Sequence, residues 1–171
     1  MNIFMVIMRL IHIPASVFWV GGVLMMVTFI SSSARAVGED ATKFMQHFSL
    51  RSGFQQSMAG AGVLAVVSGY LMYYHLFGWI APLNTGAGLA LTLGGTAGLF
   101  ALLIGAFVIG RGTNRMREIA GEIASSGGPP KPDQLAEMGS LQEGLGKAGG
   151  ITAILMVIAL IGMTLSEYFA L

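Results

Sequence analysis

Long apolar runs alternate with polar segments along this chain, and four of the runs are long enough to be membrane-spanning helices. They cover residues 3–30, 57–77, 86–110 and 149–169. A helix needs about 20 predominantly apolar residues to cross the hydrocarbon core of a bilayer. A transmembrane barrel would instead show ten-residue segments of alternating polarity, which the sequence lacks. The pattern predicts an all-α fold, an integral membrane four-helix bundle that forms a single membrane domain over residues 1–171.

The distribution of basic residues predicts how the bundle is oriented. Eight of the nine Lys and Arg residues lie in two loops, 31–56 and 111–148, namely Arg35, Lys43, Arg51, Arg111, Arg115, Arg117, Lys131 and Lys147. The turn "GWIAPLNT" and the C-terminus carry none. Because basic loops remain in the cytoplasm, we expect both loops inside the cell and both termini outside.

The two cytoplasmic loops are expected to contain short amphipathic helices. In "EDATKFMQHFSLR", four apolar residues share one helical face, which is typical of a helix lying in the membrane interface: Ala41, Phe44, Met45 and Phe48. "GRGTNRMREIAGEI" extends the third span, and "SSGGPPKP" is expected to end that helix. Asp133 is the expected cap of a further helix, "QLAEMGSLQEGL", that leads to the fourth span.

Composition supports a membrane location and narrows the chemistry. The chain has 171 residues, of which 54% are hydrophobic and 10% charged, with a mean hydropathy of +0.75 and a formal net charge of +1. Average soluble domains carry roughly 25% charged residues. We therefore expect a multi-pass protein of the cell membrane, the bacterial inner membrane in particular, whose partner is the lipid bilayer and not nucleic acid. The absence of cysteine excludes disulfides, thiolate metal sites, iron–sulfur clusters and attached c-type haem.

The first span carries the most informative polar residues, because an ionisable side chain at membrane depth is a functional candidate. At helical spacing, His12 shares a face with Met5, Met8, Ser16 and Trp19. This stripe is expected to face the other helices. Arg9 lies one turn outward from His12.

The second span adds a histidine near its outer end, His75, whose face includes Ser68. Since the second span runs in the opposite direction to the first, His12 and His75 are expected at comparable depth. Two neutral imidazoles across a bundle can bind both axial positions of a b-type haem, and Arg9 can pair with a propionate. Glu167, near the outer end of the fourth span, is an alternative partner for Arg9. The competing interpretation is that both histidines make structural hydrogen bonds.

Methionines and glycines offer further interpretations. Thioether and imidazole ligands on one face, as at Met5, Met8 and His12, suit Cu(I), although methionine also fills apolar cores. Gly94 and Gly98 form a small-xxx-small pair, and Gly62 and Gly69 lie on the second span. Glycines at these positions allow close helix packing within a bundle or a homo-oligomer.

The first-helix pattern H-x6-W-x-G-G (His12, Trp19, Gly21 and Gly22) resembles the signature of small bacterial membrane families, namely the copper-resistance D family and the membrane protoporphyrinogen oxidase of haem synthesis. The "SGYLMY" stretch and the arginine-bearing loop before the fourth span are also similar to these four-helix proteins. In the oxidase family the first-helix histidine is implicated in binding b-type haem, which the resemblance transfers to His12. That family also has a functional lysine in its third helix, and this chain has Trp79 in the preceding turn but no lysine in the span.

Three functions follow from these patterns. The first is binding of b-type haem in the outer half of the bundle, for electron transfer or for haem and porphyrin handling, with candidate residues His12, His75, Arg9, Trp19, Ser16 and Ser68. The second is a cofactor-free accessory subunit of a larger respiratory or photosynthetic membrane complex. The third is copper transport or handling. The sequence contains no paired carboxylates in the membrane and no defensible nucleophile–base pair, so we assign no catalytic residues.

Overall fold

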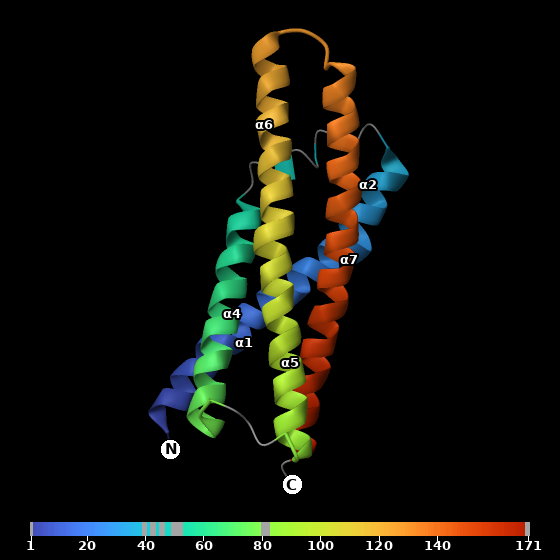
Figure 1. Ribbon diagram of the computed structural model, residues 1–171. Helices are drawn as coiled ribbons and strands as arrows, with labels where there is room; N and C mark the ends of the chain where they lie inside the picture. Colours follow the sequence, from blue (N-terminus) through green and yellow to red (C-terminus); the bar gives the residue numbers. More distant parts are fainter. Residues whose placement is uncertain are drawn as a thin grey trace.

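Four long helices account for almost all of the computed structural model, and each is long and apolar enough to cross a membrane (Figure 1). The structure describes residues 2–38, 41, 44, 47–48, 53–79 and 83–169. The expected interfacial helix over residues 39–51 lies largely outside these residues. The predicted all-α four-helix architecture is confirmed, and the chain is a multi-pass membrane protein.

The helices extend further than the apolar runs. The first begins as α1 (Ile3–Met25), passes through a π-helical turn, η1 (Met26–Ile30), and ends as α2 (Ser31–Val37). The second is α4 (Phe54–Phe77). The third comprises α5 (Gly86–Ile104), a second π turn, η2 (Gly105–Ile109), and α6 (Gly110–Ser126), and the fourth is α7 (Pro132–Tyr168).

Local sequence explains where these helices begin and end. The side chains of Asn2 and Thr85 accept hydrogen bonds from backbone amides in the first turns of α1 and α5. Gly127 ends α6 with φ of 64°, a left-handed conformation that favours glycine. The helix α7 begins at Pro132 with Lys131 as its N-cap, so Asp133 lies in the first turn and is not the cap that the sequence predicted.

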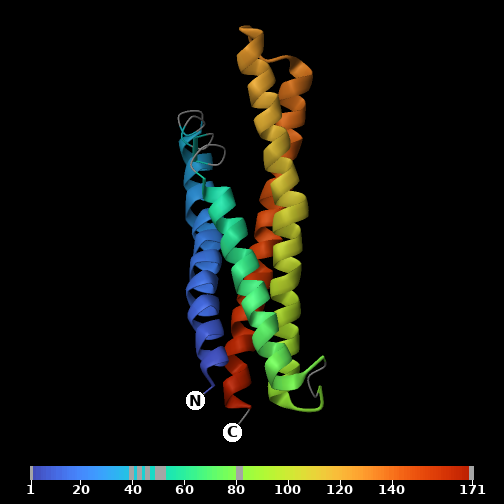
Figure 2. The same ribbon diagram turned by 90° about the vertical axis from the view of Figure 1, so that its left-hand side faces the viewer.

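Both termini lie at one end of the bundle, and the α6–α7 hairpin projects beyond the other helices at the opposite end (Figures 1 and 2). We keep the orientation predicted from the basic loops and call these the outer end and the cytoplasmic end. The helices pack as two pairs, α1 with α4 and α5 with α7, which meet through α4–α5 and α1–α7 contacts.

Close packing depends on glycines in both pairs. In the α5–α7 pair, an added Cβ at Gly162 would lie 2.7 Å from the carbonyl oxygen of Ala90, and one at Gly94 would lie 3.1 Å from that of Ala159. The two backbones therefore touch. The α1–α4 pair differs, because there the glycines receive side chains: Trp19 fills the space at Gly62. These positions confirm part of the expected close packing, although Gly95 faces open space.

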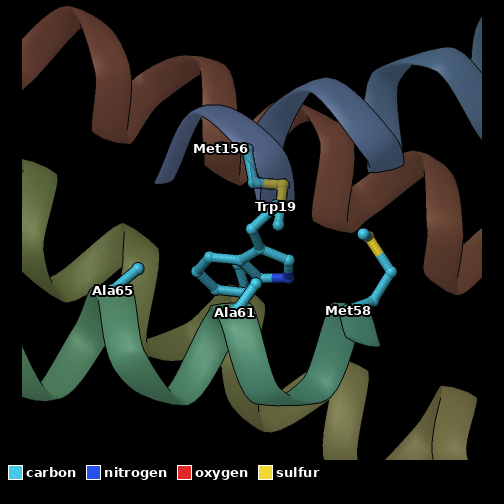
Figure 3. Packing of buried hydrophobic residues seen from close by; sticks show 6 residues of the cluster. Trp19, Met58, Ala61, Ala65 and Met156 are labelled. Carbon is cyan, nitrogen blue, oxygen red and sulfur yellow. The ribbon is translucent and has the colours of Figure 1, made fainter. Parts of the chain in front are cut away.

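The hydrophobic core forms around Trp19, which is 7% exposed. Its indole lies between Met58, Ala61 and Ala65 of α4 and Met156 of α7 (Figure 3). Because lipid tails are as apolar as the helices, the close packing of this large ring favours helix association through van der Waals contacts. Trp19 thus fixes the depth at which α1 meets both neighbours.

An ion-pair cluster ties the two arms of the cytoplasmic hairpin together. Arg115 of α6 donates two hydrogen bonds to the carboxylate of Glu137 on α7, from Nε at 2.7 Å and from a terminal nitrogen at 3.0 Å. It also contacts Glu118 at 3.2 Å and Glu122 at 3.6 Å. The hydrogen bonds from Arg115 hold the pKa of Glu137 below its ordinary value and raise the pKa of Arg115.

The lowered pKa of Glu137 predicts that acid loosens the hairpin. A group whose pKa is lower in the folded state stabilises that state above its unfolded pKa and loses this effect as the pH falls through the folded pKa. We therefore expect hydrogen-exchange protection factors in α6 and in residues 132–147 to be constant near neutral pH and to fall below about pH 4. Glu137→Gln should show the reduced protection at neutral pH already. Equal protection of Glu137→Gln and the parent protein near neutral pH would contradict this role.

Candidate functional site

His12 is fixed against α4 by a hydrogen bond that also defines its tautomer. Its Nδ1 lies 2.8 Å from the carbonyl oxygen of Ala65. Because a carbonyl oxygen only accepts, Nδ1 is the protonated nitrogen of the neutral ring. The other nitrogen, Nε2, then carries the free lone pair, which is the form of imidazole that binds a metal.

Two α4 residues position this imidazole. Ser68 is 3% exposed, and its hydroxyl lies 3.3 Å from His12 Nδ1 while donating to the carbonyl groups of Leu64 and Ala65. Gly69 leaves the space that the ring occupies, since an added Cβ there would lie 2.9 Å from His12 Cε1. The candidate residues His12 and Ser68 therefore lie together, and Gly69 and the Ala65 carbonyl group are contacts of His12 that the sequence analysis did not name.

His75 lies elsewhere, and the expectation that it shares the depth of His12 is wrong. Its Nε2 is 2.7 Å from Asn2 Nδ2, and its ring lies 5.1 Å from that of Phe4. His12 meets α4 at Gly69, six residues from His75, which corresponds to about 9 Å along a helix. Two axial ligands of one haem must face each other across a single iron. The structure does not place His12 and His75 in that relation.

The helices α1 and α7 pack at mid-depth and separate towards the outer end. On α7, one stripe at helical spacing contains Ala153, Met156, Leu160, Thr164 and Glu167. Met156 packs on Trp19 and is 1% exposed, whereas Leu160 is 54% exposed and Thr164 and Glu167 are also exposed. Burial along this stripe ends abruptly one turn beyond Met156.

The facing stripe of α1 changes in the same direction. Trp19 is buried, Ser16 and His12 are half-buried, and Arg9 is exposed. We call the surface formed by Arg9, His12, Ser16, Leu160, Thr164 and Glu167 the outer α1–α7 face. Its inner limit is the Trp19–Met156 contact, so Trp19 belongs to the hydrophobic core below this face. The role of Trp19 at a cofactor stays a prediction.

Arg9 and Glu167 fall at similar levels of the outer α1–α7 face. Trp19 of α1 packs on Met156 of α7, and the two helices are antiparallel. Arg9 lies ten residues outward from Trp19, and Glu167 lies eleven residues outward from Met156. No ion pair joins them, so the alternative partner that the sequence suggested for Arg9 is not in contact. Within the part of the chain that the structure describes, Arg9 makes no ion pair.

The face is not a multi-residue metal centre. Among the described residues, no group of three or more His, Cys, Asp or Glu side chains gathers closely enough to hold a metal ion. Two apolar grooves lie away from His12. One, of about 440 Å³, is lined by residues of η1, α2 and the following segment, and the other, of about 250 Å³, lies between Leu24 and α7. His12 thus offers one nitrogen ligand on a face that also carries Arg9 and Glu167.

Comparisons of this chain with known protein families, with curated proteins and with solved structures returned no match.

Proposed function

We propose that this protein binds b-type haem at the outer α1–α7 face, with His12 Nε2 as an axial ligand, and acts in electron transfer or in haem and porphyrin handling. The observation that carries the proposal is the hydrogen bond from His12 Nδ1 to the Ala65 carbonyl. Metal-binding histidines almost always donate their second ring N–H to a carbonyl or carboxylate, which orients the ring and makes Nε2 more basic.

The surroundings of His12 suit a haem in two further respects. Arg9 lies one turn outward on α1, and its guanidinium has no carboxylate partner among the described residues, so it is available to a propionate. Leu160 of α7 contributes an exposed apolar side chain to the same face, which suits the apolar surface of a porphyrin. When bound, a haem supplies one-electron redox chemistry, which none of the side chains of this face supplies itself.

His75 serves as the matched control for the role of His12. Both histidines belong to the α1–α4 pair, but His75 contacts Asn2 at the outer end, whereas His12 contacts Ala65 and Ser68 deeper in the bundle. Protein purified from membranes is expected to show a Soret band. We expect His12→Ala to lose it and His75→Ala to keep it.

The absorption spectrum and the metal content together decide between the candidate functions. A purified protein without a Soret band, or a band that is unchanged in His12→Ala, would overturn the proposal. Copper bound in a His12-dependent way, without haem, would instead support copper handling, which the shared face of Met5, Met8 and His12 allows.

A further inference from the structure

Two of the four spans contain a π turn at the level where the membrane bundle meets the hairpin, and glycines of α7 lie beside them. The first and third helices contain the π turns η1 and η2 there, and α7 has adjacent glycines, Gly149 and Gly150. Contacts place these features side by side: an added Cβ at Gly149 would lie 3.5 Å from Val27 of η1, and Gly112, just after η2, packs on Leu145 of α7. This level coincides with the predicted membrane boundaries at residues 110 and 149.

Glycines weaken both helices that cross this level into the hairpin. Gly105, Gly110 and Gly112 lie within eight residues of the third helix, and Gly144, Gly146, Gly149 and Gly150 lie within seven residues of α7. Glycine is the weakest helix former after proline. Packing does not account for all of them, because nothing lies within 4 Å of an added Cβ at Gly144, Gly146 or Gly150.

Gln55 marks the same level on α4. Its Oε1 is buried and has no hydrogen-bond partner among the described residues, while its Nε2 lies 3.7 Å from an added Cβ at Gly110. A buried amide oxygen without a partner is unfavourable, so a rearrangement at this level that satisfies it would be stabilised. The π turns contribute as well, since such turns interrupt the regular helical hydrogen bonding and are frequent at functional sites.

The hairpin beyond this level is tied together internally. Arg115 binds Glu137 across the two arms, and Ile119 between them is 0% exposed. Leu145 fills the space left by Gly112. The Arg115–Glu137 pair and Ile119 lie beyond the glycines, towards the hairpin tip, so the hairpin can keep its own structure while the segments below it bend.

We propose that the α6–α7 hairpin is an arm that swings as a unit about this level, with η2 and the Gly149–Gly150 pair as its two hinge points. The device does not rest on haem binding. The hairpin and the membrane part of α7 belong to one helix, Pro132–Tyr168. A contact at the hairpin tip would therefore change the bend at Gly149–Gly150 and, with it, the packing of α7 in the membrane.

The absence of cysteine allows a direct test by pulsed electron-spin distance measurements in lipid nanodiscs. Ser57→Cys and Ser125→Cys place spin labels on exposed positions of α4 and of the hairpin tip. We expect two distance populations for this pair. Ser125→Cys with Gln142→Cys, both within the hairpin, should give one narrow population.

Alanine substitutions then locate the motion. Gly149→Ala and Gly150→Ala together should remove the second population, since the space at both positions accepts a methyl group. Gly139→Ala is the matched control: it is an equally open glycine of α7 beyond the hinge, and it should leave the distances unchanged. One narrow α4–hairpin distance in the parent protein, or two populations that persist in the Gly149/Gly150 double variant, would overturn the proposal.

Discussion

Gly162→Ala is expected to force α5 and α7 apart and to lower the free energy of unfolding by about 1–3 kcal/mol, the usual cost of overpacking. The added Cβ would lie 2.7 Å from the Ala90 carbonyl oxygen and 3.0 Å from Gly94 Cα. Both neighbours are backbone atoms, which cannot rotate away as a side chain can. The gain in helix propensity from glycine to alanine, about 1 kcal/mol, offsets only part of this cost.

The measurement is unfolding in detergent micelles followed by circular dichroism. Gly95→Ala is the matched control, because Gly95 lies next to Gly94 on the same helix and nothing is within 4 Å of its added Cβ. The control should be as stable as the parent protein or slightly more stable. Equal stability of the two variants would show that the α5–α7 backbones do not meet as described.

Under the proposed function, Gly69→Ala is expected to lower the affinity for haem, although this variant still has a histidine at position 12. The added methyl group would lie 2.9 Å from His12 Cε1 and 3.2 Å from Nδ1, so the imidazole must move away from the Ala65 carbonyl. Loss of such a supporting hydrogen bond typically costs 10–100-fold in metal affinity, and we expect a loss of roughly that size.

Titration of haemin into the purified protein measures this affinity. Gly60→Ala, on the same helix with open space at its added Cβ, controls for the general effect of a methyl group on α4. Unchanged haem affinity in Gly69→Ala would mean that the position of His12 against α4 does not matter for binding.

Hydropathy predicted the number of spans and most of their outer boundaries, but not the ends of the helices in the cytoplasm. The second apolar run, 57–77, agrees closely with α4, whereas the fourth run begins at residue 149 and its helix begins at Pro132. An apolar run ends where the membrane ends. A helix continues as long as its backbone hydrogen bonds and side-chain contacts do, here as far as the Arg115–Glu137 hairpin.

Part of the site followed from helical periodicity. The inward direction of His12 was predicted correctly. The depth of His75 was not, because α4 ends only two residues after His75, whereas His12 is nine residues from the start of α1. A signal for the true register was present: His12 and Trp19 are seven residues apart, as are their contacts Gly69 and Gly62.

The glycines show what sequence could not resolve. Gly94 was predicted to support close packing and does so, but its neighbour across the interface is Gly162, 68 residues further along the chain, which the sequence analysis did not single out. Which glycine meets a backbone, which receives a ring and which faces open space depends on the rotation of the neighbouring helix. That rotation is set by the packing of the whole bundle.

Trp19 offers the most direct test of haem at the outer α1–α7 face, because its indole forms the inner limit of that face two turns from His12. Trp79→Phe removes the only other tryptophan and leaves Trp19 as the sole indole reporter. Haemin titrated into this variant should quench Trp19 fluorescence and produce a Soret band, both saturating at one haem per chain. Both changes should be absent when His12→Ala is added. The account would be contradicted if Trp79→Phe showed neither quenching nor a Soret band. It would also be contradicted if both signals were the same with and without His12→Ala.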